Sequence, residues 1–141
     1  MILLDTNVVS EPLRPAPEAR VIEWIDAQAL ETLYLSAITV AELRAGVALL
    51  PAGKRRSRLH DQLEKRMFPM FVGRVLPFDM ACTNAYADML VKMRAAGRRS
   101  IGTADACIAA IAIAHGFTVA TRDTGPFRAV GLHVINPWES A

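Results

Sequence analysis

Short apolar runs alternate with amphipathic segments along this chain of 141 residues, and this alternation restricts the possible fold more than any other feature. The apolar runs predict buried strands at residues 2–4, 33–35, 75–78, 118–120 and 133–135. Helical spacing of apolar residues, with breakers and caps at the ends, predicts helices over residues 18–29, 39–50, 54–67, 80–96 and 103–115. Strands that alternate with helices favour an α/β fold, a three-layer sandwich with a mainly parallel central sheet.

Length and composition fit a single domain over residues 1–141, because a hydrophobic fraction of 52% can build a core without disulfide or metal staples. Cys82 and Cys107 form no C-x-x-C pair, so we interpret them as reduced thiols in the core. The sequence carries no basic amino-terminal region with a signal-length apolar run, and no apolar stretch long enough to span a bilayer. We therefore expect a cytoplasmic location and no contact with a membrane.

Four acidic residues lie where strands are predicted to end or helices to begin. Asp5 and Asp123 come just after the carboxyl ends of predicted strands, and Glu42 and Asp105 fall in the first turns of predicted helices. In parallel α/β folds, ligands collect at the carboxyl ends of the strands. The four side chains are therefore expected to share one edge of the sheet.

Each acid also has a purely structural interpretation. Asp5 is able to cap a short helix, and Asp123 is able to form an Asx turn. Thr39 and Glu42 match a capping box, in which the glutamate returns a hydrogen bond to the cap residue. Asp105 lies near a helix start, where the helix dipole favours an acid. Taken singly, each residue leaves these alternatives open.

Taken together, the acids point to a cation. No Lys or Arg lies at helical spacing beside Glu42 or Asp105, and carboxylates that share a pocket repel one another unless a cation neutralises them. Oxygen ligands alone suit Mg²⁺ or Mn²⁺. A cation held in this way binds a phosphodiester oxygen and lowers the pKa of a bound water, so we predict metal-assisted hydrolysis of a phosphate ester.

Basic residues form two clusters, although the net charge of the chain is only +2. Clusters of this kind can contact the phosphates of a nucleic acid, and they also occur simply as solvated helix faces or loops. Both interpretations stay open at this point. The candidate contacts to nucleic-acid phosphates are Lys54, Arg55, Arg56, Arg58, Arg98 and Arg99.

Other kinds of site fit poorly. The three histidines are scattered and no two have metal-ligand spacing, which argues against a histidine acid–base ribonuclease. Gly97 and Gly102 have the spacing of a P-loop, but Thr103 stands where that motif requires Lys, and a predicted helix precedes the loop. We therefore expect no nucleotide site there.

The motifs as a set resemble those of the PIN-domain nucleases. Within that family they are similar to the VapC toxins of toxin–antitoxin pairs, and most of all to the FitB-like branch. The resemblance spans nearly the whole chain in the expected order. It is carried by Ile-Leu-Leu-Asp-Thr-Asn-Val-Val-Ser at residues 2–10, Leu-Ser-Ala-Ile-Thr-Val-Ala-Glu-Leu at 35–43, Thr-Ala-Asp-Ala-Cys-Ile-Ala-Ala at 103–110, Ala-Thr-Arg-Asp at 120–123 and Asn-Pro-Trp at 136–138.

The resemblance implies a parallel sheet between helices and cleavage of RNA that depends on Mg²⁺ or Mn²⁺. Asp5 and Asp105 would contact the metal directly, while Glu42 and Asp123 would complete the pocket or hold a metal-bound water. The polar neighbours that would orient these groups, unless they make only local turns, are Thr6, Asn7 and Thr121.

One departure affects the fourth acid. Many relatives read T-R-N-x-x-D-F at the stretch that here covers residues 121–127. In this chain Asp123 replaces the usual Asn, and Pro126 replaces the later Asp. The carboxylate has thus moved along the chain, a form that suits the FitB-like branch.

The family also implies partners. It implies a homodimer and a small antitoxin that carries a DNA-binding domain and wraps the toxin with its carboxyl-terminal segment. An arginine of the antitoxin would occupy the acidic pocket, and operator DNA would be bound only through the antitoxin.

Two other functions were considered. An aspartyl-phosphate phosphatase of the haloacid dehalogenase type would use Asp5 as nucleophile, but it requires a second Asp where this chain has Asn7. The other alternative is a weakly active or inactive partner that completes a transcription-regulating complex with a DNA-binding antitoxin. The presence of all four acids argues against a dead site.

Overall fold

A computed structural model of the chain describes residues 1–98 and 101–139. Its centre is one sheet of five strands, all parallel to their neighbours, in the order β3-β2-β1-β4-β5. The strands are β1 (Ile2–Leu4), β2 (Leu33–Ser36), β3 (Val75–Leu76), β4 (Thr118–Ala120) and β5 (Val134–Ile135).

The chain order places a topological switch point beside β1. From β1 the chain goes to β2 on one side, whereas β4 pairs with β1 on the other side, with Leu3 opposite both Tyr34 and Val119. In open α/β sheets the ligand crevice lies outside the carboxyl ends of the strands at such a point. The segments that follow β1 and β4 therefore flank the crevice.

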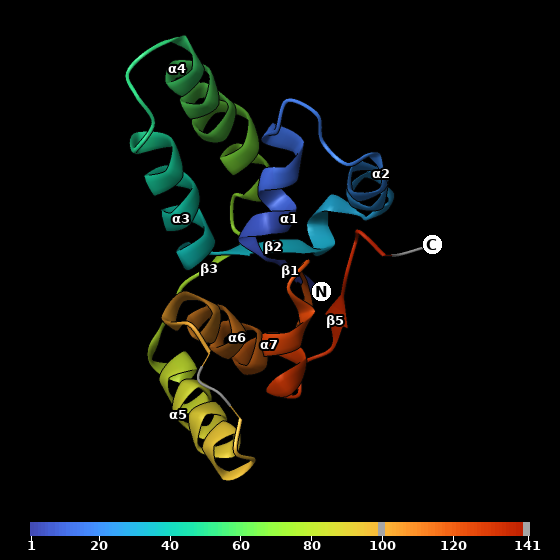
Figure 1. The fold of residues 1–141 in the computed structure, drawn as a ribbon, viewed down its shortest axis with the longest axis vertical. Helices are drawn as coiled ribbons and strands as arrows, with labels where there is room; N and C mark the ends of the chain where they lie inside the picture. The colour runs from blue at the N-terminus through green and yellow to red at the C-terminus, as the bar shows by residue number, and fades with distance from the viewer. Residues whose placement is uncertain (99–100, 140–141) are drawn as a thin grey trace.

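Helices cover both faces of the sheet (Figure 1). On one face lie α1 (Thr6–Ser10), α2 (Ala19–Ala27), α3 (Ala37–Ala48) and α4 (Lys54–Asp61), with the short helical segments η1 (Glu11–Leu13), η2 (Leu30–Thr32), η3 (Gln62–Met67) and η4 (Phe68–Phe71). On the other face lie α5 (Met80–Ala95), α6 (Thr103–His115) and α7 (Thr124–Ala129).

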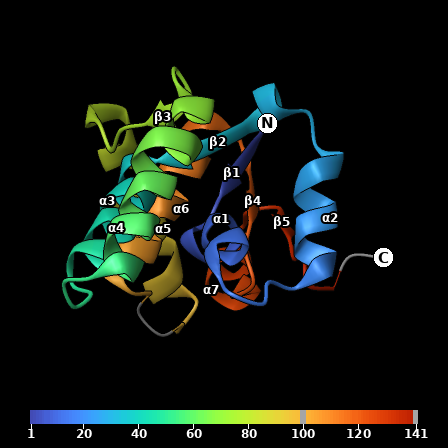
Figure 2. The same ribbon diagram turned by 90° about the horizontal axis from the view of Figure 1, so that it is seen from above.

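The hydrophobic core is split by the sheet into two clusters. Successive residues of β1 face opposite sides, so Leu3 packs with Ile108 and Ile111 of α6, while Leu4 packs with Leu35 and Leu63. Viewed from above, α3 and α4 lie side by side at one end and α2 lies at the other end, with the strands between them (Figure 2). The predicted three-layer α/β sandwich is confirmed.

Several predicted elements agree with the structure to the residue, and others differ. The strands at 2–4 and 118–120 and the helix at 103–115 are confirmed. The helix predicted from residue 39 begins at Ala37, because Ser36 is its N-cap and accepts the Thr39 amide at 3.0 Å. The prediction of Thr39 as the cap and of Glu42 in the first turn was therefore wrong, and Glu42 lies in the second turn.

The helix predicted over 54–67 changes character partway. It is α-helical in α4 and continues as the π-helical segment η3. None of the helices in the described part of the chain is long and apolar enough to cross a membrane.

Candidate acidic site

Asp5 ends β1 and is the most buried of the four acids, with 5% of its surface exposed. Its Oδ1 accepts the Thr6 amide at 2.8 Å, which makes Asp5 the N-cap of α1. Its Oδ2 accepts the Thr121 hydroxyl at 2.8 Å and faces Asn7 Nδ2 at 3.5 Å. The capping role proposed for Asp5 is confirmed, and one oxygen is still directed at the loop after β4.

Thr121 ties the end of β4 to the end of β1. Its hydroxyl donates to Asp5 and accepts from Asn7 Nδ2 at 3.4 Å and from the Asp123 amide at 3.1 Å. A threonine hydroxyl has one proton and two lone pairs, so all of its hydrogen-bonding capacity is used. Asn7 adds a second link, because its Oδ1 accepts the Arg122 amide at 3.2 Å.

Trp138 braces the same loop from the carboxyl-terminal segment. The Arg122 guanidinium lies over the Trp138 ring at 5.1 Å, and the Trp138 carbonyl accepts from Arg20 Nη1 at 2.9 Å. The closing Asn-Pro-Trp motif thus supports the backbone that carries Thr121 and Asp123.

Glu42 reaches the same edge from α3. Its Oε1 accepts the Thr6 hydroxyl at 2.7 Å, rather than the return bond to Thr39 that a capping box would require. The Thr6 hydroxyl also lies 3.1 Å from Thr39 Oγ1. Thr6 therefore joins two acids, with its amide on Asp5 and its hydroxyl on Glu42.

Asp105 and Asp123 come from the other side of the crevice. Asp105 is partly buried in the first turn of α6. Asp123 is exposed at the start of α7, and its side chain does not cap that helix. The turn there is made by the Thr121 hydroxyl on the Asp123 amide, so the Asx turn considered for Asp123 is replaced by a threonine turn.

The charges of the four carboxylates influence the pKa values of Asp5 and Asp105. Burial raises the pKa of Asp5 above its usual value, hydrogen bonds from Thr121 and Thr6 lower it, and the charges of Asp105 and Glu42 raise it, with a net upward shift. Burial also raises the pKa of Asp105, and the charges of Asp123 and Glu42 add to that rise. The charges of the four acids therefore act on one another across the carboxyl edge of the sheet, and their joint role as a metal site stays a prediction.

No base neutralises this pocket within the described residues. The ion pairs found among the described residues involve Glu11, Asp61 and Glu64, and none includes Asp5, Glu42, Asp105 or Asp123. The donor set of unneutralised carboxylate oxygens fits a hard divalent cation. In the described ranges, no three or more His, Cys, Asp or Glu side chains are grouped closely enough to hold a metal ion as they stand.

The basic residues take two different positions. Lys54, Arg55, Arg56 and Arg58 lie on α4, in the α3–α4 hairpin that extends away from the sheet (Figure 1). Arg98 instead lines a pocket of about 330 Å³ with Gly102 and Pro126, next to the starts of α6 and α7. Arg99 lies outside the described residues.

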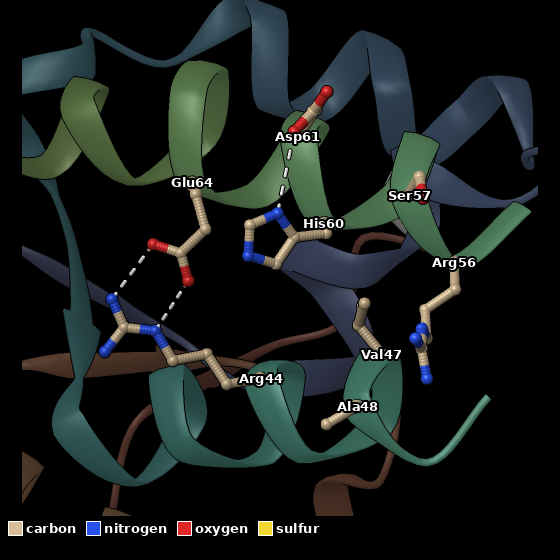
Figure 3. Close-up of a pocket in the computed structure, with 8 residues that line it drawn as sticks. All are labelled: Arg44, Val47, Ala48, Arg56, Ser57, His60, Asp61 and Glu64. Atoms are coloured by element: carbon tan, nitrogen blue, oxygen red, sulfur yellow. Dashed lines mark hydrogen bonds and ion pairs between the residues drawn. The ribbon is translucent and has the colours of Figure 1, made fainter. Parts of the chain in front are cut away.

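A larger pocket, of about 650 Å³, lies between α3 and α4 (Figure 3). Arg44 and Glu64 point toward one another across it and form two hydrogen bonds, of 2.8 and 3.1 Å. His60 and Asp61 approach to 3.5 Å. None of the four site acids lines this pocket, and both of its own acids are paired, so it is separate from the acidic site.

Sequence reasoning missed the buried hydroxyls behind Glu42. Ser36 and Thr39 were not recognised as part of the site, because Thr39 was considered only as a helix cap. The signal was the spacing Ser-x-x-Thr-x-x-Glu at residues 36–42, which places the three side chains on successive turns of α3 and its cap.

The fold and the site together define an α/β protein with an acidic crevice at the switch point of its sheet. The sequence model of the PIN domain matches residues 2–132. The chain belongs to the PIN-domain family, among its VapC and FitB-like members. This membership leaves the haloacid dehalogenase alternative without support.

Similar proteins cover essentially the whole chain. The plasmid stability protein StbB of Pseudomonas syringae pv. tomato is 70% identical over 99% of this chain and 100% of its own length. The VapC ribonuclease Y4jK of Sinorhizobium fredii is 57% identical over 100% of both chains. A solved structure of FitAB bound to an IR36 DNA fragment matches with a TM-score of 0.96 and 52% identity, over 100% of this chain and 98% of that one.

Proposed function

We propose that the protein is a metal-dependent endoribonuclease and the toxin of a type II toxin–antitoxin pair. The observation that carries this proposal is the set of four acids whose charges act on one another, which raises the pKa values of Asp5 and Asp105, and which forms no ion pair within the described residues. The similarity to a protein named as a VapC ribonuclease supports RNA as the substrate.

The residues have separate roles in this proposal. Asp5 and Asp105 contact Mg²⁺ or Mn²⁺ directly, because Asp5 is buried, Asp105 is partly buried, and the charges of neighbouring acids act on both. Glu42 and Asp123 are more exposed, and they complete the pocket or hold a metal-bound water. When bound, the cation activates water and stabilises charge on the phosphate.

The chain's own polar residues prepare the site. Thr121 and Asn7 fix the Asp5 carboxylate against the loop after β4, and the Thr6 amide and hydroxyl connect Asp5 with Glu42. Supporting hydrogen bonds of this kind orient metal ligands and commonly change metal affinity or activity by about 10- to 100-fold when lost.

The proposed partners follow from the relatives. A complex of FitAB on DNA supports a cognate antitoxin that carries the DNA-binding domain, with operator DNA reached only through it. We further propose a homodimer. The candidate contacts to RNA phosphates are the basic residues Lys54, Arg55, Arg56 and Arg58 of α4, together with Arg98 and Arg99.

The test is cleavage of a mixed structured-RNA pool by antitoxin-free protein in Mg²⁺, Mn²⁺ or EDTA. Asp5→Asn and Asp105→Asn should abolish cleavage, because each removes a carboxylate from the metal site. Asp88→Asn is the matched control, since Asp88 is exposed on α5 away from the acids. Cleavage that persists in EDTA or in both site variants would overturn the proposal.

The alternative of a regulatory complex with little nuclease activity is favoured by one finding, the DNA-bound structure of the similar FitAB. Folded protein that cleaves nothing in any metal, yet represses its own operon with its antitoxin, would support this alternative instead.

A further inference from the structure

A chain of three hydroxyl groups runs from the buried end of β2 to Glu42. Ser36 Oγ lies 3.2 Å from Thr39 Oγ1, which lies 3.1 Å from Thr6 Oγ1. The Thr6 hydroxyl then lies 2.7 Å from Glu42 Oε1. Ser36 and Thr39 are fully buried, whereas Glu42 is exposed. The chain thus connects the protein interior with the acidic site.

The hydroxyl protons of Ser36, Thr39 and Thr6 are all directed toward Glu42. An ionised carboxylate only accepts hydrogen bonds, so the single proton of the Thr6 hydroxyl is directed at Glu42. Thr6 Oγ1 therefore meets Thr39 as an acceptor, and Thr39 donates to it. Thr39 Oγ1 in turn accepts from Ser36, so the direction runs from the core to the carboxylate.

The hydrogen bonds of the buried Ser36 hydroxyl favour this direction as well. Ser36 Oγ already accepts the Thr39 amide at 3.0 Å. If the chain were reversed, the Ser36 proton would need another acceptor, and an unpaired buried donor costs free energy. Among the described residues, no buried side-chain nitrogen or oxygen lacks a partner.

We propose that Ser36 and Thr39 are positioning residues that, through Thr6, hold the Glu42 carboxylate in place relative to Asp5. Thr6 is the joint, because its amide donates to Asp5 Oδ1 at 2.8 Å while its hydroxyl holds Glu42. The separation of the two acids is thereby fixed from the core. This inference rests on the proposed metal site.

A purely structural role for Thr39 can be separated from this one. The start of α3 is capped by Ser36 Oγ on the Thr39 amide, and Thr39→Val keeps that amide and a β-branched side chain. Thr39→Val therefore cuts the hydroxyl chain but leaves the cap. Thr39→Ser restores the hydroxyl. Thr83→Val is the matched control, because the Thr83 hydroxyl bonds only within α5, to Met80.

The experiment measures Mn²⁺ binding to the full-length variants by electron paramagnetic resonance, and the Glu42 side-chain rotamer in metal-free protein by NMR. Thr39→Val should weaken Mn²⁺ binding by about 10-fold and replace one Glu42 rotamer by an average. Thr39→Ser and Thr83→Val should match the wild type. Thr6→Val removes the next hydroxyl, at a partly exposed position, and should reproduce the weaker Mn²⁺ binding and the averaged Glu42 rotamer. It replaces Thr39→Val in the test if that variant does not fold.

The outcomes distinguish this inference from the proposed function. Wild-type Mn²⁺ binding and an unchanged Glu42 rotamer in Thr39→Val would overturn the inference while leaving the nuclease intact. Equal loss in Thr39→Ser and Thr39→Val would also overturn it, because the hydroxyl would then not be the cause. Wild-type protein that binds no Mn²⁺, with Glu42 still released in Thr39→Val, would overturn the proposed function and leave the positioning role standing.

Discussion

At the scale of single residues, structural and functional roles coincide in Asp5. Its carboxylate caps α1 through the Thr6 amide and also accepts the Thr121 hydroxyl across the crevice. The helix cap orients one oxygen, and the hydroxyl orients the other. The sequence left open whether Asp5 is a helix cap or a site ligand. In the structure the capping hydrogen bond itself orients the Asp5 carboxylate toward the site.

Thr121 should matter more than its size suggests, because its hydroxyl serves one acceptor and two donors at once. We expect Thr121→Val to reduce cleavage by about 10- to 100-fold. It should also cost about 1–3 kcal/mol of stability, since the Asp123 amide and Asn7 lose their acceptor. Thr121→Ser should recover both properties, as measured by cleavage rate and chemical denaturation. A valine variant with full activity would show that Asp5 needs no support from β4.

At the scale of elements, the sequence predicted best where local and tertiary signals agree. The helix α6 is apolar from Ala106 to Ala114 and is capped after His115 by Gly116, with a positive φ of 70°, so its bounds were predicted to the residue. The strands β1 and β4 are short, buried and followed by polar residues. The carboxyl-edge placement of Asp5, Asp105 and Asp123 follows directly from these elements.

The sequence failed where tertiary contacts decide. The helices α1 and α7 have only 5 and 6 residues, too few to show an apolar period. At the start of α3, Thr39 was predicted as the cap, but Ser36, three residues earlier, takes that place because it ends a paired strand. The partners of the Thr39 and Thr6 hydroxyls lie 33 or 36 residues away in sequence, beyond the reach of any local pattern.

The cap of α5 provides a test of stability without function. Asp79 accepts the Cys82 amide at 3.3 Å, as the sequence predicted, and α5 carries none of the four site acids. We expect Asp79→Ala to lower the Tm by a few degrees through loss of the cap, with cleavage unchanged below the transition. A thermal scan and a cleavage assay at low temperature would check this. Loss of cleavage in folded Asp79→Ala would mean that α5 contributes to the site.

At the scale of the whole molecule, the four site acids and the basic residues of α4 belong to different parts of the fold. The acids occupy the carboxyl edge of the sheet, and four basic residues lie on the α4 arm of the hairpin that extends from it (Figure 1). If that arm contacts RNA, Arg55→Ala with Arg56→Ala should weaken RNA binding. The slope of log affinity against log salt should then flatten by about 1.4, or about 0.7 per lost phosphate contact. Unchanged affinity and slope would remove the α4 cluster from the RNA-binding surface, leaving Arg98, near the starts of α6 and α7, as the remaining described candidate.

The four neighbouring acids predict an unusual pH dependence for the folding stability of the metal-free protein. The pKa values of Asp5 and Asp105 are raised in the folded state above their ordinary 3.8. Between that value and neutral pH the folded state therefore binds more protons than the unfolded state, so these two groups make the protein more stable as the pH falls. Carboxylates with lowered pKa, such as Asp79 and Glu64, act in the opposite direction.

A variant isolates the contribution of Asp105, whose side chain makes none of the hydrogen bonds found in the described residues. At pH 7, metal-free Asp105→Asn should be more stable than the wild type by about 0.5–2 kcal/mol, because a repelling charge is removed. The gap should shrink as the pH falls and close below the ordinary value of 3.8, where the wild-type carboxyl is protonated in both states. Denaturant titrations across this pH range measure the gap, with Asp88→Asn as the control that should show none. Saturating Mn²⁺ should reverse the order at pH 7, since an ion at 100 times its Kd stabilises the wild type by about 2.7 kcal/mol. A gap that stays constant with pH would mean that Asp105 is not held in the repulsive pocket from which the nuclease is proposed.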